Sequence, residues 1–95
     1  MPREVHDNPS RQRYELEVPG GIVFADYRLR DGILAITHTE TPRALQGQGL
    51  ASKLVEGMIE DARERKLKIM PLCSFVVDYF RRHPEAHDVL ADGAD

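Results

Sequence analysis

The sequence predicts an α/β (α+β) fold in which helices pack against a mixed, mostly antiparallel sheet, in the order β-β-β-α-β-α. Three observations support this prediction: apolar and charged residues alternate from Tyr14 to Val18, turn signals separate two further β-branched runs, and helical spacing begins at Leu50. The chain has 95 residues, 41% of them hydrophobic and 31% charged, which suits one domain over residues 1–95 and leaves no room for a second.

Three strands are expected before the first helix. Residues 1 to about 10 are polar and are expected to form a tail, and the first strand follows from Arg13 with its alternating pattern. A Pro-Gly-Gly turn leads to the second strand, Ile22–Leu29. Because an Asp-Gly pair tolerates positive φ, Asp31-Gly32 predicts a tight hairpin to the third strand, Ile33–Thr39.

The helices are marked by a change of period. Apolar residues recur at helical spacing over about 16 residues from Leu50, although Gly57 inside this segment costs about 1 kcal/mol relative to alanine. A short apolar strand, Leu67–Leu72, follows and suits a buried position beside an earlier strand. A second helix is expected from Ser74 and ends before Pro84, and residues 91–95 are expected to be frayed.

Charge and composition exclude several classes of protein. The formal net charge of −3 argues against a nucleic-acid binder, which usually has a basic face. The single cysteine excludes an internal disulfide, and His6, His83 and His87 are scattered in polar stretches, so no metal site is expected. The polar first residues lack a signal segment, and no apolar run approaches the ~20 residues that span a bilayer, so the prediction is a cytoplasmic protein without a membrane partner.

The stretch between the third strand and the first helix, Thr41–Ala51, has the properties of a phosphate-binding turn. Gly47 and Gly49 allow backbone N–H groups to approach a phosphate without a Cβ in the way. The helix that follows offers unpaired N–H groups and a partial positive charge, to which Arg43 or Lys53 could add a charge-assisted contact. Neither the P-loop motif nor GxGxxG is present, and on the glycines alone a loose helix entry without a ligand explains the stretch equally well.

Gln46-x-x-Gly49-x-Ala51 resembles the (Q/R)-x-x-G-x-(G/A) signature of the GNAT superfamily of acetyltransferases, whose backbone amides hold the pyrophosphate of coenzyme A. Together, the segments ITHTETPRALQGQGLASKLV and KIMPLCSFVVDYFRRHPE resemble a small, single-domain GNAT-like family of N-acetyltransferases, over roughly residues 13–90. The resemblance implies a minimal acyl-CoA N-acyltransferase fold and acetyl-CoA as the acetyl donor.

The resemblance also implies where the coenzyme lies. Backbone amides from Gly47 to Ala51 would face the pyrophosphate, and the strand that ends near Thr39 would line the pantetheine arm where it splays from the strand Leu67–Leu72. The residues expected to contact the coenzyme are Thr39, Arg43, Gln46, Gly47, Gln48, Gly49, Leu50, Ala51, Ser74 and Tyr79. Arg81 and Arg82 either reach its 3′-phosphate or remain solvated charges at a helix end.

Cys73 is the candidate nucleophile, because it lies where the short strand ends and the second helix begins. A thiol at a helix N-terminus feels the helix dipole, which favours the thiolate. In the resembling family this position faces the thioester, so one hypothesis is that Cys73 accepts the acetyl group and passes it to an amine. The alternative is a small, buried core cysteine.

His38 is the candidate general base, because histidine ionises near neutral pH and could deprotonate Cys73 or an incoming amine. A structural histidine, or Glu40 as the base, are the alternatives. Tyr79 lies one residue before the position where related acetyltransferases carry a tyrosine that protonates the departing thiolate. One residue is about 100° around a helix, which favours a core or coenzyme-edge role for Tyr79.

The sequence therefore predicts an acetyl-CoA-binding N-acetyltransferase with an unidentified amine acceptor, either a small molecule or a protein. A non-catalytic coenzyme A-binding or sensing module is the first alternative, because this chain lacks the additional N-terminal helices that help to form the acceptor groove in longer members of the superfamily. A small interaction protein that binds no nucleotide is the second. The protein is expected to be a monomer or a weak homodimer formed through a sheet edge.

Overall fold

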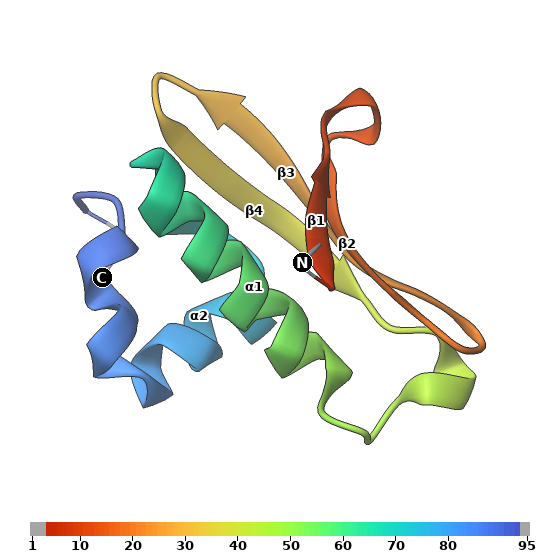
Figure 1. Cartoon of the computed structure of the whole chain (residues 1–95). Helices are drawn as coiled ribbons and strands as arrows, with labels where there is room; N and C mark the ends of the chain where they lie inside the picture. Colours follow the sequence, from red (N-terminus) through yellow and green to blue (C-terminus); the bar gives the residue numbers. More distant parts are fainter. Residues whose placement is uncertain (1–3, 94–95) are drawn as a thin grey trace.

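The computed structural model describes residues 4–93 and shows one five-stranded sheet with two α-helices (Figure 1). The strands lie side by side in chain order, the first four antiparallel and the fifth parallel to the fourth. They are β1 (Val5–Asn8), β2 (Arg13–Val18), β3 (Gly21–Arg30), β4 (Ile33–Glu40) and β5 (Lys68–Pro71). The helices are α1 (Leu50–Arg65) and α2 (Ser74–Arg82), with short 3-10 turns at η1 (Pro9–Arg11), η2 (Arg43–Leu45) and η3 (Pro84–Val89).

The predicted α+β class, the three-stranded meander and the two helices are confirmed, but the chain begins with a strand that the sequence analysis missed. The expected tail at residues 1 to about 10 is wrong for its described part, because β1 pairs with β2 and places Val5 opposite Leu16. Residues 1–3 lie outside the described range. The polar composition of β1 gave no strand pattern. The two residues of β1 that face α1 are Val5 and Asp7, and Asp7 accepts hydrogen bonds from Tyr27 and Arg65.

The core lies between α1 and the sheet. Tyr14, opposite Ala25 in the ladder between β2 and β3, is fully buried, and its hydroxyl donates to Asp61 of α1. This contact identifies the α1 face of the sheet, and the opposite face is called the outer face below. The largest fully buried side chains are those of Tyr14, Leu16, Leu34, Ile36, Leu54, Met58, Ile69, Val23, Val55 and Val76.

Gly57 explains why α1 can lie so close to β1. An added Cβ at this position would overlap the Cβ and both methyl groups of Val5, so only glycine allows this approach. The helix has the 16 residues that its periodicity predicts. It ends at Lys66, whose φ of 58° places it in the left-handed region and whose amide donates to the last turn.

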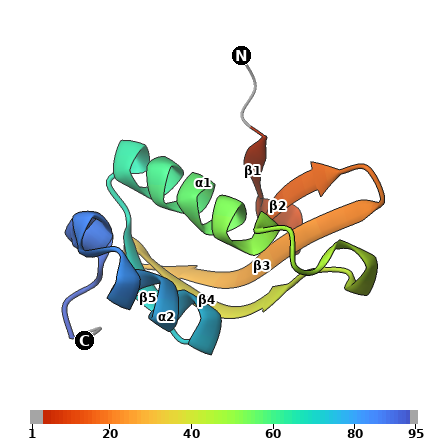
Figure 2. The same ribbon diagram turned by 90° about the horizontal axis from the view of Figure 1, so that it is seen from below.

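The chain after α1 closes the edge of the sheet at β5. Figure 2 shows that α1 lies along the sheet and that α2 lies beside β4 and β5. The second helix contacts α1 as well as these two strands. The expected fraying at residues 91–95 is wrong for the described part, because Ala91 is buried and its amide donates to the Ile69 carbonyl at 2.8 Å. Residues 94 and 95 lie outside the described range. Between residues 4 and 93, no helix is long and apolar enough to cross a membrane.

Candidate active site

The glycine turn between β4 and α1 leaves open space around its backbone. Gly47 and Gly49 have φ values of 83° and 74°, in the left-handed region that favours glycine, and an added Cβ at either would have no atom within 4 Å. Gly49 is the N-cap of α1, and no side chain within the described residues forms a capping hydrogen bond there. The first-turn amides of α1 are therefore free to meet an anion, at the positive end of the helix dipole.

Beside this turn is a cavity of about 180 Å³ that reaches from α1 to α2. The Gln46 side-chain amide donates to the Thr41 carbonyl at 3.2 Å, so Gln46 closes the turn from within. Phe75 of α2 forms part of the wall and is 38% exposed. The full lining is Thr41, Leu45, Gln46, Gly47, Gly49, Leu50, Ala51, Ser52 and Phe75. Space, free amides and an exposed ring together fit a phosphate group followed by an organic arm.

The two cations that the sequence offered for this site lie in different surroundings. Arg43 is exposed in η2, within the turn itself. Lys53 forms an ion pair with Glu4 on the β1 side of α1, with both side chains more than half exposed. Exposed pairs contribute little free energy, so the pair holds Lys53 only weakly. A phosphate contact by Arg43 or Lys53 stays a prediction.

β4 and β5 separate just where the coenzyme arm was expected to enter. Their ladder covers Ile33–Ile36 opposite Lys68–Pro71. It ends at the Ile36 carbonyl, which accepts from the amides of both Leu72 and Cys73, at 3.0 and 3.1 Å. Beyond this point β4 continues to Glu40 while the other chain turns into α2. The sheet is therefore open between the last residues of β4 and the start of α2.

A β-bulge in β4 decides which side chains face this opening. His38 pairs with Asp26 of β3, but the next pair is Ile36 with Tyr27, so Thr37 is an extra residue without a partner in the ladder. Thr39 pairs with the buried Ala25 and shares its α1 face. Before the bulge, the β4 residues that face α1 are the even-numbered Leu34 and Ile36. After the bulge the odd-numbered Thr39 faces α1, because the extra residue shifts the alternation of side chains between the two faces by one.

Thr39 and Cys73 are the two predicted residues that the structure brings together. The Thr39 Oγ1 lies 3.5 Å from the Cys73 Sγ, and the thiol is partly buried. Burial raises the pKa of the Cys73 thiol, whereas the hydroxyl of Thr39 and the backbone N–H groups of Phe75 and Val76 lower it. Together the hydrogen bonds have the larger effect, so the pKa lies below its ordinary value. Cys73 is the N-cap of α2 but forms no strict capping hydrogen bond, so these amides act mainly as dipoles.

His38 lies elsewhere. Its ring packs edge-on against Phe24 at 6.4 Å between centroids, and its Nε2 is 3.3 Å from the Glu40 Oε1, all on the outer face. Within residues 4–93, no hydrogen bond joins His38 to Cys73. The structure thus brings His38 together with Glu40, the alternative base, and leaves the action of His38 on an acceptor as a prediction.

Tyr79 and the arginines of α2 lie beyond the opening. The Tyr79 ring stacks on His83 at 4.1 Å and borders a hollow of about 60 Å³ shared with Ser52 of α1. Burial raises the Tyr79 pKa, and the carboxylates of Glu56 and Glu85 raise it further, so the hydroxyl keeps its proton at neutral pH. The exposed Arg82 pairs with Asp78 at 2.7 Å. Ser74 and Arg81 are exposed at the two ends of the helix.

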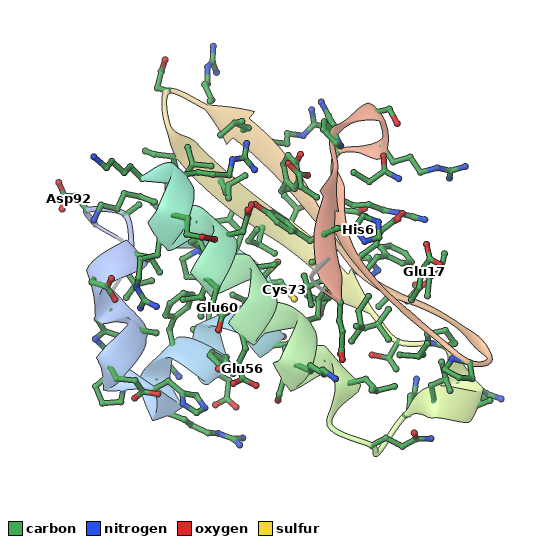
Figure 3. The ribbon with its side chains drawn as sticks, viewed as in Figure 1. His6, Glu17, Glu56, Glu60, Cys73 and Asp92 are labelled. Carbon is green, nitrogen blue, oxygen red and sulfur yellow. The ribbon has the colours of Figure 1, made fainter. Side chains whose placement is uncertain are left out.

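Two acidic groups lie away from these residues. Figure 3 shows His6 and Glu17 well apart from Cys73. One possible ligand atom from each of His6, Glu15 and Glu17 lies within 4.8 Å of the other two. This cluster was not predicted, because its histidine belongs to β1, a strand that the sequence did not predict. Glu15 already accepts from Arg13 at 2.6 Å, and that guanidinium would repel a bound cation. The group is thus a poor metal site.

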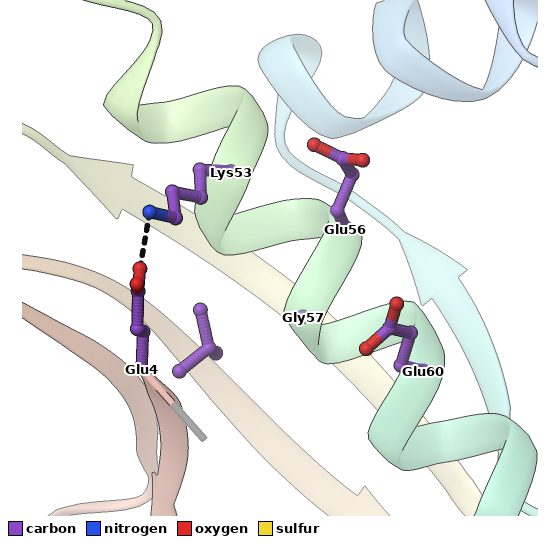
Figure 4. A pocket seen from close by; sticks show the side chains of 6 residues that line it. Glu4, Lys53, Glu56, Gly57 and Glu60 are labelled. Atoms are coloured by element: carbon purple, nitrogen blue, oxygen red, sulfur yellow. Dashed lines mark ion pairs between the residues drawn. The ribbon is translucent and has the colours of Figure 1, made fainter. Parts of the chain in front are cut away.

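A second acidic group lines a cavity of about 270 Å³ between β1 and α1 (Figure 4). Its carboxylates belong to Glu4, Glu56 and Glu60. Lys53 also lines it, but the other residues expected to contact the coenzyme and both catalytic candidates lie outside it.

Two comparisons show which known proteins this chain is similar to. A family model described as GCN5-related N-acetyl-transferase matches residues 13–89, from β2 to η3. A solution structure of a protein from Staphylococcus aureus, assigned as a GCN5-like N-acetyltransferase, is similar to this chain with a TM-score of 0.71. The two sequences are 27% identical, and the similarity covers 93% of this chain and 87% of that chain.

Proposed function

Because this chain belongs to the GCN5-related N-acetyl-transferase family, we propose that it binds acetyl-CoA at the turn Thr41–Ala51 and transfers the acetyl group to an amine. The family establishes an acetyltransferase in general terms. The observation that carries the finer proposal is the glycine turn: two left-handed glycines with open space beside them stand before an uncapped α1. A pyrophosphate is an anion that such a group of donors suits.

The coenzyme would run from this turn toward the opening between β4 and α2. The cavity at the turn already reaches Phe75, which offers an exposed apolar surface to the arm. Thr39 and Cys73 lie at the opening, where β4 no longer has β5 beside it. Ser74 and Tyr79 extend the same path along α2, Tyr79 as a coenzyme-edge residue.

Two routes for the acetyl group fit these positions. In direct transfer the protein holds thioester and amine together. The amine attacks the acetyl carbon and loses a proton to a base, while the bond to the coenzyme sulfur breaks and the coenzyme leaves as a thiolate. In a relay, the Cys73 thiolate attacks that carbon, the bond from the acetyl group to the coenzyme sulfur breaks, and the coenzyme leaves as a thiol after gaining a proton. The amine then attacks the Cys73 thioester, loses its proton to a base, and releases the Cys73 thiolate.

The lowered pKa of the Cys73 thiol supports the relay, since a larger fraction of thiolate is present at neutral pH. Because no hydrogen bond joins His38 to Cys73 within residues 4–93, we assign to His38 the second of its two expected roles, deprotonation of the incoming amine. The substitution His38→Gln is then expected to slow acetyl transfer while leaving the affinity for acetyl-CoA unchanged. An equal loss of affinity would contradict this role.

Calorimetric titration and thermal shift with acetyl-CoA test the binding site. Wild type is expected to bind and to be stabilised by the ligand. Gly49→Val is expected to lose both effects, because a β-branched residue is strained at a φ of 74° and its side chain would occupy the open space. Gly32→Val is the matched control: Gly32 has a φ of 78° and the same open space, but lies in the hairpin between β3 and β4.

The control separates loss of stability from loss of binding. Gly32→Val is expected to be destabilised like Gly49→Val and still to bind acetyl-CoA. If wild type shows no affinity, or if Gly49→Val binds as well as Gly32→Val does, the proposed site is wrong. Binding without turnover on a panel of amines would instead assign the chain as a non-catalytic coenzyme A-binding module.

A further inference from the structure

The bulge at Thr37 exchanges the faces of two neighbouring side chains. Ile36 lies on the α1 face, so regular alternation would turn His38 toward α1 and Thr39 outward. The extra residue reverses this order: His38 pairs with Asp26 on the outer face, and Thr39 pairs with Ala25 on the α1 face. The side chain that reaches the Cys73 sulfur is therefore a hydroxyl and not an imidazole.

We propose that Thr39 is a positioning residue for Cys73, whose hydroxyl donates a hydrogen bond to the sulfur and holds it at the opening beside β4. The inference rests on the relay route of the proposed function, in which Cys73 receives the acetyl group. It adds a second residue to the reacting end of the site, and it assigns the side-chain interaction with the sulfur to the hydroxyl of Thr39.

Cys73 is held to β4 from two directions. Its backbone amide donates to the Ile36 carbonyl at 3.1 Å, which fixes the main chain, and its sulfur lies 3.5 Å from the Thr39 Oγ1, which limits the side-chain rotamer. Both contacts come from the same strand, three residues apart, and the bulge lies between them. The geometry of β4 thus determines where the sulfur lies.

A hydroxyl at this place also selects the charged form of the sulfur. A hydrogen bond donated to a thiolate is stronger than one donated to a neutral thiol, so Thr39 favours ionisation. The amides at the start of α2 act in the same direction. Thr39 is the side-chain component of this effect, and so it can be removed without changing the helix.

The test compares Thr39→Val, which keeps the shape but lacks the hydroxyl, with Thr39→Ser, which keeps the hydroxyl. The rate of Cys73 alkylation by iodoacetamide is measured against pH in the free protein, together with the ultraviolet absorbance of the thiolate. Thr39→Val is expected to titrate about one pH unit higher, with about tenfold less thiolate at any pH below both midpoints. Thr39→Ser is expected to titrate close to wild type.

Thr37→Val is the matched control, because Thr37 lies on the same strand but its hydroxyl approaches the Asp26 carbonyl, at 3.4 Å. It is expected to leave the titration of Cys73 unchanged. A Thr39→Val curve that coincides with wild type overturns the proposal, and so does a Thr39→Ser curve shifted as far as that of Thr39→Val. Since no ligand is used, failure of acetyl-CoA binding would overturn the proposed function without altering this result.

Discussion

Gly57 of α1 and Val5 of β1 pack so closely that no side chain larger than hydrogen fits at position 57. This contact is where the first strand meets the helix, and it joins two segments that are far apart in the sequence. Around it the exposed surface carries Glu56 and Glu60, which share the cavity shown in Figure 4.

Gly57→Ala is expected to lower the free energy of unfolding by about 1–3 kcal/mol, because the overpacking against Val5 outweighs the gain in helix propensity of about 1 kcal/mol. Urea denaturation measures this change. Glu60→Ala, on an exposed position of the same helix, is the control and is expected to stay within about 0.5 kcal/mol of wild type. A more stable Gly57→Ala would show that β1 moves away at no cost.

Tyr14→Phe is expected to destabilise the protein by about 1–3 kcal/mol, because it removes a donor from a buried hydrogen bond. The fully buried Tyr14 donates to the Asp61 Oδ2 at 2.6 Å, and the Arg65 guanidinium lies 3.3 Å from the same hydroxyl. Thermal or urea unfolding provides the measurement. Tyr79→Phe is the control, since within residues 4–93 the Tyr79 hydroxyl forms no hydrogen bond; equal losses in the two variants would contradict the argument.

Glu15 predicts a loss of stability in acid. Burial raises the pKa of this carboxyl, whereas hydrogen bonds from Arg13 and Asn8 lower it. Together the hydrogen bonds have the larger effect, so the pKa is below its ordinary value. Between the folded and the unfolded pKa of Glu15, the unfolded chain binds more protons than the folded chain. The stabilisation of the fold by ionised Glu15 is therefore complete above the ordinary carboxyl range and is lost as pH falls through the folded pKa. Denaturation midpoints measured from neutral pH downward show this decline.

Glu15→Gln is expected to be less stable than wild type at neutral pH, because it removes the charge that Arg13 pairs with. Its stability is also expected to depend less on pH in the acid range. Glu17→Gln, on the same strand but exposed, should keep the wild-type slope. If the stability of Glu15→Gln changed with pH as steeply as that of wild type, this prediction would be wrong.

Cys73 is expected to gain one acetyl group when the protein is exposed briefly to acetyl-CoA and its intact mass is measured. The label should disappear on addition of an acceptor amine and should be absent from Cys73→Ala. Loss of most transfer activity in Cys73→Ala would support the relay. No added acetyl mass in wild type, together with full activity in Cys73→Ala, would leave direct transfer as the route.

Local patterns predicted most of the fold because they had strong periods. The alternation from Tyr14, the Asp31-Gly32 hairpin and the apolar spacing after Leu50 all correspond to observed elements. β1 was missed because its ladder partner and its contact with Gly57 lie far along the chain, and its own four residues include one apolar side chain. Such a strand is stabilised by tertiary contacts that local sequence does not encode.

The site was predictable in the same uneven way. The glycine turn has a motif, and Cys73 lies at an element boundary that the pattern marks clearly. The pairing of Thr39 with Cys73 depends on the bulge at Thr37, for which no residue type gives a signal here. Regular alternation would have placed His38, and not Thr39, on the α1 face that the thiol shares.

The single unmatched residue of β4 acts as a phase shift in the strand. If the same residues paired in regular alternation, with Thr37 in the ladder, His38 would face inward and Thr39 outward, although every amino acid stayed the same. The side chain that reaches the sulfur is therefore determined by the pairing register of β4 as much as by side-chain identity. A shift of the pairing register by one residue, with no substitution at all, would exchange one kind of proton donor for another.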